Sequence, residues 1–243
     1  MTSTLGEWEE KCSGKPLKLS VIIPVFNERN TIREIITRVL ESTSVNEIVI
    51  VDDGSTDGTR EILEKLKPNK MIRVLLHDAN VGKGAAVRTG INAVKGDLII
   101  IQDADLEYDP RDYPKLLQPI QEDIADVVYG SRFLGGSRRP IYFWNMVANK
   151  ILIFTTNILY NNILSDMETG YKLFKKDVVK DIKIKAKGFN FEPEFTAKLL
   201  KRGVRIYEVP IRFNPRLYSE GKKIKLSDAF HAMWTLVKYR FVD

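Results

Sequence analysis

Three carboxylates follow a short apolar run at alternate positions of the chain. Residues 97–109 read DLIIIQDADLEYD, so Asp103, Asp105 and Glu107 come just after the uncharged residues 98–101. Negative charges at this spacing repel one another unless a cation lies among them. Oxygen ligands of this kind suit a hard divalent ion such as Mg²⁺ or Mn²⁺, whose other ligands are usually waters and phosphate oxygens. The residues therefore predict a metal and phosphate site at the end of this run.

A second acidic turn and a glycine-flanked lysine could contribute to the same site. Residues 48–57 read IVIVDDGSTD, which puts Asp52 and Asp53 at the end of another apolar run. Ligands of an open parallel sheet bind beyond the carboxyl ends of its strands, so both acidic turns are expected at one edge. Lys83 lies between glycines in GKG, which would let the backbone approach a phosphate. The alternative for GKG is a flexible entry into a helix.

Apolar runs and helical periods alternate between residues 19 and 131, and these elements must position the carboxylates. Four of the runs show almost no polar alternation, which is typical of parallel strands covered on both faces. We predict strands at 19–26, 47–53, 72–78, 97–103 and 126–131, and helices at 30–43, 57–67 and 82–96. This order predicts an α/β fold with a doubly wound, mainly parallel sheet and flanking helices.

Beyond residue 131 the pattern changes. Residues 132–140 form a basic, glycine-containing loop, and residues 143–164 are apolar and aromatic but interrupted by Lys150 and several asparagines. The second of these segments is either a core helix packed on the sheet or a helix that lies against a membrane or a partner protein. We predict a loop at 165–174, a helix at 190–202, a strand at 204–213, a basic loop at 214–225 and a helix at 227–241.

Length and charge limit the class of protein. The 243 residues are enough for one large α/β domain, and contents of 44% hydrophobic and 29% charged residues are ordinary for a globular protein. The net charge of +6 favours an anionic partner, but no helix-turn-helix, zinc or RNA-binding motif supports nucleic acid. No uninterrupted run of about 18 apolar residues is present, so no membrane-spanning helix is predicted. Residues 1–18 are too polar for a signal peptide and are expected to form a flexible extension.

Three segments, in this order, resemble the family 2 glycosyltransferases of the GT-A fold. They are VIIPVFNE at 21–28, IVIVDDGSTDGT at 48–59 and NVGKGAAVRTGINAVKGDLIIIQDADLEYDP at 80–110. Within that family the chain is most similar to the subgroup that resembles dolichol-phosphate mannose synthase and bacterial polyprenyl-phosphate glycosyltransferases. The resemblance implies a single GT-A domain at 19–243. Its nucleotide-sugar half would be 19–131, and its acceptor half, with amphipathic helices, would be 132–243.

The resemblance also implies a set of donor-binding residues. They would line the nucleoside pocket, bind the nucleoside through the DDGS turn, and close over the diphosphate from a basic C-terminal loop. These residues are Pro24, Phe26, Glu28, Asp52, Asp53, Lys83, Asp103, Arg216 and Lys222. Asp105 would be the main metal ligand, with Asp103 and Glu107 as further carboxylates. The family often has Tyr at the position of Phe26, and dolichol-phosphate mannose synthases commonly have Gln at the position of Glu107, so this chain differs in one hydroxyl and one charge.

On the acceptor side, the resemblance implies that arginines hold a phosphate. Arg132 follows the fifth predicted strand, and Arg138 and Arg139 lie in the next loop. A planar guanidinium fits phosphate oxygens better than an ammonium does. A lipid phosphate is already anionic and needs no base, whereas a hydroxyl acceptor needs one, for which Asp166 is the first candidate. Asp105, Arg132 and Asp166 are therefore the predicted catalytic residues.

Together these features predict a metal-dependent, inverting glycosyltransferase. Mg²⁺ or Mn²⁺ would neutralise the leaving diphosphate while mannose or glucose moves from a GDP- or UDP-hexose to dolichyl or undecaprenyl phosphate. We expect the protein to be peripheral on the cytoplasmic face of a membrane, held there by residues 141–164, the last helix and the basic loops, or by a separate membrane protein. The alternative is the same fold acting on a hydroxyl of a glycan, protein or small molecule. A nucleotidyltransferase is less consistent with the sequence, because no glycine-rich loop follows the first predicted strand.

Overall fold

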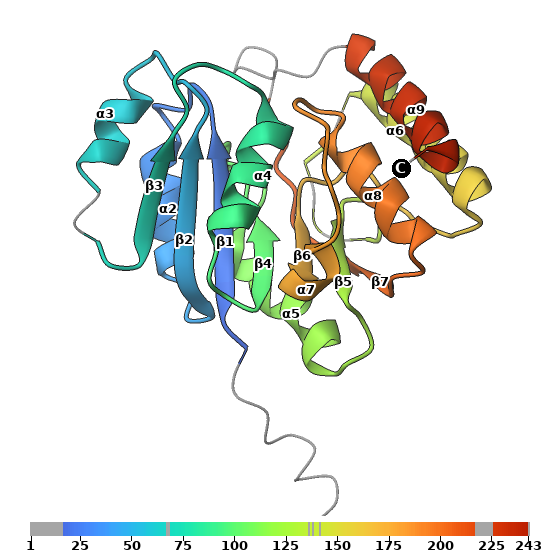
Figure 1. Cartoon of the computed structure of the whole chain (residues 1–243), viewed down its shortest axis with the longest axis horizontal. Coiled ribbons are helices and arrows are strands. Elements are labelled where there is room, and N and C mark those ends of the chain that lie inside the picture. Colours follow the sequence, from blue (N-terminus) through green and yellow to red (C-terminus); the bar gives the residue numbers. More distant parts are fainter. Residues whose placement is uncertain are drawn as a thin grey trace, which may run out of the picture.

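The structure is a computed structural model that describes residues 17–66, 69–135, 137, 139–140, 142–216 and 226–242, with only the backbone of 226–228. One sheet runs through the molecule and carries helices on both of its faces (Figure 1). This arrangement confirms the α/β fold predicted from the alternation of apolar runs and helical periods. The predicted N-terminal extension lies outside the described residues up to residue 16.

The described residues form a seven-stranded sheet in the order β3-β2-β1-β4-β6-β5-β7. Neighbouring strands are parallel except at β6, which runs antiparallel to both β4 and β5. The central strands β1 and β4 are buried along their whole length, because a strand covered on both faces needs apolar side chains throughout. The strands are β1 (Leu19–Val25), β2 (Val45–Asp52), β3 (Ile72–Leu76), β4 (Leu98–Ile101), β5 (Val127–Ser131), β6 (Lys172–Lys175) and β7 (Ile206–Pro210).

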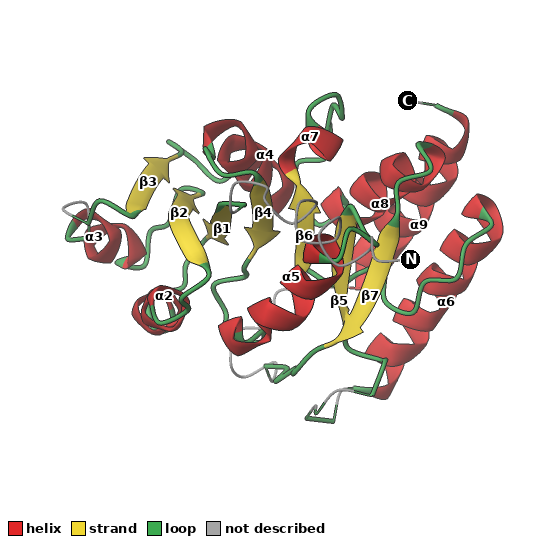
Figure 2. Ribbon diagram, turned by 90° about the horizontal axis from the view of Figure 1, so that it is seen from below, coloured by secondary structure: helices red, strands yellow, loops and turns green. Residues whose placement is uncertain are grey.

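Helices cover the two faces of the sheet separately (Figure 2). Helices α2 (Ile32–Leu40) and α5 (Tyr113–Gln121) pack on one face, and α4 (Lys83–Ala93) and α8 (Phe191–Lys201) pack on the other. The core divides in the same way: Ile23 of β1 belongs to the cluster with α2, whereas Ile22 belongs to the cluster with α4 and α8. The remaining short elements on these faces are α3 (Thr59–Glu64), the 3-10 helix η1 (Pro110–Asp112) and α7 (Lys176–Val179).

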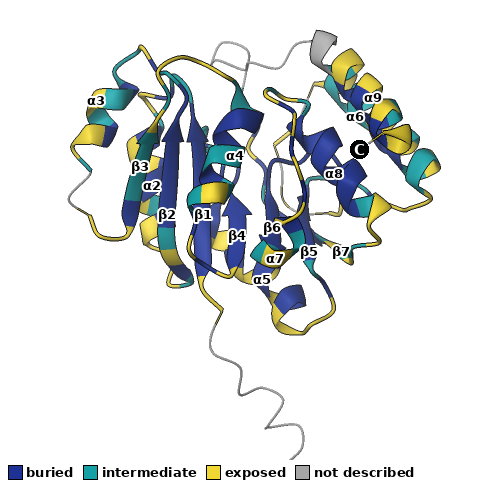
Figure 3. Ribbon diagram, viewed as in Figure 1, coloured by how far each residue is buried: buried dark blue, intermediate teal, exposed yellow. Residues whose placement is uncertain are grey.

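A further helical layer lies beyond α8. Helices α6 (Phe143–Tyr160) and α9 (Leu226–Phe241) pack side by side, and Leu152, Ile153 and Leu236 lie in the small core between them. The predicted helix at 143–164 therefore packs on another helix rather than on the sheet. Its outer face and that of α9 remain rich in exposed aromatic residues (yellow in Figure 3), namely Phe143, Trp144, Phe154, Phe230, Trp234 and Phe241. Among the described residues, no helix combines the length and the hydropathy needed to cross a membrane.

The sequence-based strands of the first half are confirmed, with ends displaced by a few residues. The predicted loop at 165–174 is wrong at its end, because β6 begins at Lys172 and inserts between β4 and β5. This strand has only four residues and begins with a buried lysine, so neither its length nor its composition predicts it. The division into donor and acceptor halves at residue 131 stays a prediction.

Candidate active site

The acidic turn after β4 lies at the carboxyl edge of the sheet. Gln102 directly follows the strand and is buried, and its amide oxygen accepts a hydrogen bond from the Tyr113 hydroxyl at 3.0 Å. Leu106 has a positive φ of 65°, and the Glu107 N–H donates to the Asp105 carboxylate at 3.1 Å. A non-glycine residue in the left-handed region reverses the chain locally. The turn therefore holds the alternating carboxylates together at the end of β4.

Lys83 forms two ion pairs beside this turn. It begins α4, and its Nζ lies 2.8 Å from Asp103 Oδ1 and 2.9 Å from Glu192 Oε1 in the first turn of α8. Burial acts to lower the pKa of the Lys83 ammonium, but the charges of Asp103 and Glu192 outweigh it and raise that pKa well above its ordinary value. Gly170 leaves room for this contact, since a Cβ there would lie 2.3 Å from Asp103 Oδ2. The structure thus confirms that Lys83 and Asp103 lie together, and it adds Glu192 to the site.

Arg216 joins the ends of β1 and β4. Its guanidinium binds both carboxylate oxygens of Glu28, at 3.0 and 3.1 Å, and its Nη2 lies 3.3 Å from Asp105 Oδ2. Its backbone N–H donates to Glu107 Oε1 at 2.8 Å. Burial, with the neighbouring charges of Asp103 and Glu107, still raises the pKa of the Asp105 carboxyl to about 7. The effect of burial and of the neighbouring carboxylates on Asp105 therefore exceeds the opposing effect of Arg216.

The donor set fits a hard divalent cation. Asp103, Asp105 and Glu107 offer carboxylate oxygens at one edge, which is the ligand chemistry of Mg²⁺ and Mn²⁺. Among the residues the structure describes, however, no three His, Cys, Asp or Glu side chains form a ready-made metal site. Lys83 and Arg216 instead bind two of the carboxylates directly. A bound cation would therefore have to compete with these side chains.

The two aspartates of the DDGS turn are used within the protein. Asp52 is fully buried, and its carboxylate accepts a hydrogen bond from Arg60 Nε at 2.9 Å. Asp53 accepts the Gly82 N–H at 2.7 Å and lies 2.7 Å from the Nδ1 of His77. Asp52 thus ties the end of β2 to α3, and Asp53 ties the turn after β2 to the start of α4. The predicted contact of both aspartates with a nucleoside stays a prediction, and the hydrogen bonds of Asp53 alone hold the GKG segment.

The other predicted nucleoside residues lie beside that turn. Pro24 is in β1, Phe26 follows it, and Glu28 comes after Asn27, whose φ is 53°. The Asn27 N–H donates to the Ser55 hydroxyl at 2.9 Å, which joins the segment to the DDGS turn. The sequence therefore brings Pro24, Phe26 and Glu28 to the same sheet edge as the β4 carboxylates.

Arg132 and Asp166 form a buried pair at the end of β5. The Asp166 carboxylate accepts hydrogen bonds from Arg132 Nε and Nη2, both at 2.7 Å, and from the Arg132 backbone N–H at 2.9 Å. Glu208 fixes the loop by accepting the Asp166 N–H at 3.0 Å. Burial acts to lower the pKa of the Arg132 guanidinium, but the charge of Asp166 raises it further above its usual range. Two residues predicted separately on the acceptor side are therefore one structural unit.

Comparison with known proteins decides the family. The model of glycosyl transferase family 2 matches residues 20–183, a segment that contains both acidic turns, Lys83 and the Arg132–Asp166 pair. The chain belongs to glycosyl transferase family 2. The sequence resemblance carried by VIIPVFNE, the DDGS turn and the D-x-D turn is thereby confirmed.

Two curated relatives lie within the range of clear sequence similarity. A dolichol-phosphate mannosyltransferase of Pyrococcus furiosus is 31% identical over 212 residues, which cover 85% of this chain and 59% of that protein. Glycosyltransferase AglJ of Haloferax volcanii is 28% identical over 202 residues, which cover 83% of this chain and 64% of AglJ. The chain thus spans less than two thirds of the length of either relative.

Solved structures agree on the fold. Glucosyl-3-phosphoglycerate synthase from Mycobacterium tuberculosis, in complex with Mn²⁺, UDP and glucosyl-3-phosphoglycerate, superposes with a TM-score of 0.72 over 100% of this chain and 86% of that one. Its complex with phosphoglyceric acid gives a TM-score of 0.74. The sequence identities are 21% and 20%, so this likeness establishes the GT-A fold of the family 2 chain and nothing finer.

Three further residues were predicted to belong to the site, namely Arg138, Arg139 and Lys222. Arg138 and Lys222 lie outside the described residues. Arg139 is described; its backbone N–H donates to the Phe213 carbonyl at 3.0 Å, which places it near the segment after β7. Its predicted contact with an acceptor phosphate stays a prediction.

Two buried titratable residues, Lys172 and Glu168, interact electrostatically with Asp166 of the buried pair. Lys172 is fully buried, its Nζ donates to the Met167 carbonyl at 2.8 Å, and burial lowers its pKa to about 8. Burial, with the charge of Glu192, raises the pKa of the Glu168 carboxyl to about 8, and its Oε1 is buried with no hydrogen-bond partner among the described residues. Both residues belong to the sequence segment DMETGYKLF, but only the fold shows that they share one buried site.

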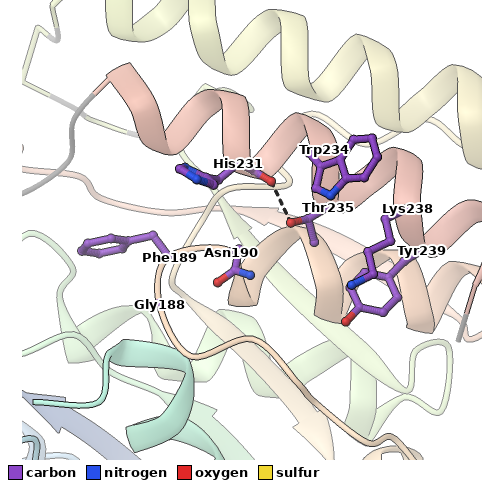
Figure 4. Close-up of a pocket in the computed structure, with 8 residues that line it drawn as sticks. All are labelled: Gly188, Phe189, Asn190, His231, Trp234, Thr235, Lys238 and Tyr239. Atoms are coloured by element: carbon purple, nitrogen blue, oxygen red, sulfur yellow. Dashed lines mark hydrogen bonds between the residues drawn. The ribbon is translucent and has the colours of Figure 1, made fainter.

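A groove lies between α9 and the loop before α8 (Figure 4). It has a volume of about 360 Å³ and is lined by Gly188, Phe189, Asn190, His231, Trp234, Thr235, Lys238 and Tyr239. The loop also touches the donor edge, because a Cβ on Gly82 would lie 2.4 Å from the Lys187 carbonyl oxygen. The loop that forms one side of the groove is therefore also packed against the start of α4.

Proposed function

We propose that the chain is a metal-dependent, inverting glycosyltransferase that moves a hexose from a nucleotide-sugar to a polyprenyl phosphate at a membrane surface. The single observation that carries the proposal is the group of carboxylates at the ends of β1 and β4, with Glu28 and Asp105 bridged by Arg216. Ligands of a doubly wound sheet bind at this edge. The family 2 relative named dolichol-phosphate mannosyltransferase supports a lipid phosphate as acceptor.

The donor-binding residues would act mainly by compensating the negative charge of the diphosphate. Asp105 and Glu107, with Asp103, would hold Mg²⁺ or Mn²⁺, which would neutralise the diphosphate as it leaves. Lys83 fixes Asp103 by an ion pair of 2.8 Å and stands at the start of α4, where backbone N–H groups favour an anion. Phe26, at the end of β1, would border the nucleoside. These residues bind and orient the donor, and none of them needs to exchange a proton.

On the acceptor side, the contacts of Asp166 favour an acceptor that needs no base. Both oxygens of Asp166 accept hydrogen bonds from the Arg132 guanidinium. Its carboxylate would therefore orient Arg132 rather than act as a general base. Arg132 would then bind the acceptor phosphate in line with the anomeric carbon, which is the positioning that such a transfer requires. A lipid phosphate supplies its own anionic nucleophile.

One observation favours a second candidate, a hydroxyl acceptor. Glu168 interacts electrostatically with Arg132 and Asp166, and burial, followed by the charge of Glu192, raises its pKa to about 8. A carboxylate with such a pKa is a competent base near neutral pH. If a hydroxyl is the acceptor, the base would therefore be Glu168 and not Asp166, the candidate that the sequence alone suggests.

The outer faces of α6 and α9 would place the protein on the membrane. Trp144 and Trp234 are 76% and 68% exposed, and Phe230 and Phe154 are similarly open. Lys238 and Arg240 lie in the last turn of α9. Exposed aromatic side chains beside basic ones suit the interface of a bilayer that contains anionic lipid.

A thermal-shift panel tests the donor side. The protein is melted with UDP or GDP, each with Mn²⁺, with Mg²⁺ or with EDTA. We expect one nucleotide to raise the melting temperature by several degrees only when metal is present, since a ligand that binds the folded state stabilises it. No metal-dependent stabilisation by either nucleotide would contradict the proposal.

Transfer of label from the selected nucleotide-sugar tests the acceptor. Polyprenyl phosphate is compared with the polyprenol of the same length, in the wild type and in Arg132→Ala. We expect product only with the phosphate, and loss of product in Arg132→Ala with metal-dependent nucleotide binding retained. Glu168→Gln is the matched comparison, because its activity on a phosphate acceptor should persist. Transfer to the free alcohol that Glu168→Gln abolishes would favour the hydroxyl acceptor instead.

A further inference from the structure

Arg216 holds together the carboxylates at the ends of β1 and β4, which we call the donor edge. Its guanidinium binds Glu28 through two hydrogen bonds of 3.0 and 3.1 Å, and its Nη2 reaches Asp105 Oδ2 at 3.3 Å. The backbone N–H of Arg216 donates to Glu107 Oε1 at 2.8 Å, so the main chain and the side chain of Arg216 both bind the turn after β4. The side chain is only 17% exposed. One arginine therefore neutralises carboxylates from the ends of two neighbouring strands.

Lys83 and Arg216 reach the acidic edge from different parts of the chain. Five carboxylates meet there, and these two cations form ion pairs with four of them. The carboxylates are Glu28, Asp103, Asp105, Glu107 and Glu192. Lys83 is fixed between Asp103 and Glu192, on two different elements. Arg216, in contrast, meets the turn from the segment after β7, so it is the cation that can leave Asp105 without disturbing α4 or α8.

A divalent cation and the guanidinium compete for one oxygen. Mg²⁺ binds carboxylate oxygens at about 2.0–2.1 Å, and Arg216 Nη2 already lies 3.3 Å from Asp105 Oδ2. Both cations on that oxygen would stand within a few ångströms of each other and repel. A diphosphate removes the conflict, because it brings negative charge for the metal and an alternative partner for the guanidinium.

We infer that Arg216 occupies the cation position of the donor site in the ligand-free protein, and that a divalent metal enters together with the nucleoside diphosphate rather than before it. The inference rests on the proposed function, because it takes the diphosphate as the donor group. It makes Arg216 a positioning residue that compensates part of the negative charge of the acidic edge until the donor binds. Metal alone should therefore bind weakly, and the nucleotide should strengthen metal binding.

Electron paramagnetic resonance of free Mn²⁺ tests this order without any activity assay. Mn²⁺ is titrated into the wild type, Arg216→Ala and Arg216→Gln, alone and with saturating UDP or GDP. We expect both variants to bind Mn²⁺ alone about tenfold more tightly than the wild type, the scale of one charge-assisted hydrogen bond. With nucleotide present, this advantage should vanish or reverse. The glutamine variant retains a polar side chain, so it serves where the alanine variant does not fold.

Arg212→Ala is the matched control. Arg212 lies four positions earlier on the same segment, and its Nη1 is 3.7 Å from Asp112 rather than near the carboxylate turn. It should bind Mn²⁺ like the wild type in both conditions. Equal affinity of the wild type and both Arg216 variants for Mn²⁺ alone would overturn the inference and leave the proposed function standing. Absence of nucleotide-dependent Mn²⁺ binding in every protein would instead overturn the proposed function as well.

Discussion

Replacing Asp166 by asparagine tests whether this residue positions Arg132. Asp166 is fully buried and accepts three N–H groups of Arg132, at 2.7, 2.7 and 2.9 Å. Breaking a buried ion pair by removing one partner costs about 3–5 kcal/mol. Because the asparagine amide keeps one acceptor oxygen, we expect Asp166→Asn to lower the free energy of unfolding by about 3 kcal/mol. In a domain of this size that loss lowers the melting temperature by about 6–12 °C.

A double-mutant cycle in urea measures the pair directly. The wild type, Asp166→Asn, Arg132→Met and the double variant are unfolded under the same conditions. The double variant should lose less stability than the sum of the single variants, by about 2 kcal/mol or more, since the two residues act as one unit. Asp166→Asn should retain metal-dependent stabilisation by nucleotide, because the donor carboxylates are untouched. Additivity within about 0.5 kcal/mol would refute the reasoning.

Two further predictions concern the buried acid and the exposed helices. Burial, followed by the charge of Glu192, raises the folded-state pKa of Glu168 from 4.5 to about 8, so its contribution to stability is complete below pH 4.5 and is lost as the pH rises through 8. Scanning fluorimetry should therefore show that Glu168→Gln gains melting temperature over the wild type by more at pH 8 than at pH 5, and an equal difference at both values would count against it. In sedimentation with vesicles containing anionic lipid, Trp144→Ser/Trp234→Ser should bind at least about tenfold less, because burying even about 60 Å² of indole surface is worth about 1.5 kcal/mol. Ile124→Ser, a 47% exposed residue just after α5, should bind like the wild type, and unchanged binding of the double tryptophan variant would refute a membrane role for α6 and α9.

Buried strands were predictable where burial on both faces demands a run of apolar residues. β4 satisfies that demand throughout, β1 does so apart from Ser20, β2 does so from Ile48 to Val51, and the predicted positions of all three are confirmed. β6 does not satisfy it, since Lys172 begins the strand and its ammonium is satisfied by the Met167 and Thr169 carbonyls at 2.8 and 2.5 Å. Whether carbonyl oxygens will bind a buried lysine depends on tertiary contacts, and no local sequence pattern reveals these contacts. The antiparallel insertion of β6 was therefore beyond sequence reasoning.

The positions of the acidic site residues could be predicted from the sequence, but the side chains that form ion pairs with them could not. Asp103 and Asp105 follow an apolar strand, and residues after parallel strands share one edge, so their placement follows from topology. Arg216 reaches Asp105 from 111 residues further along the chain. Nothing in the residues around Arg216 says that it lies on the acidic turn. The family resemblance implies that Arg216 binds the donor, but only the fold shows that Arg216 contacts Glu28.

The difference between the two acidic turns shows what makes a carboxylate available to a ligand. Asp53 and Asp105 are the same residue type at the same edge of the sheet. Asp53 receives the Val81 and Gly82 N–H groups at 3.0 and 2.7 Å, so the protein itself stabilises its charge. Asp105 receives one backbone N–H, at 3.1 Å, and otherwise depends on the Arg216 side chain at 3.3 Å. A cation can replace a side chain at small cost to the fold, whereas it cannot replace backbone donors without unfolding a turn. We therefore expect a cation to bind at the β4 turn, where the fold supplies few backbone hydrogen bonds, rather than at the DDGS turn.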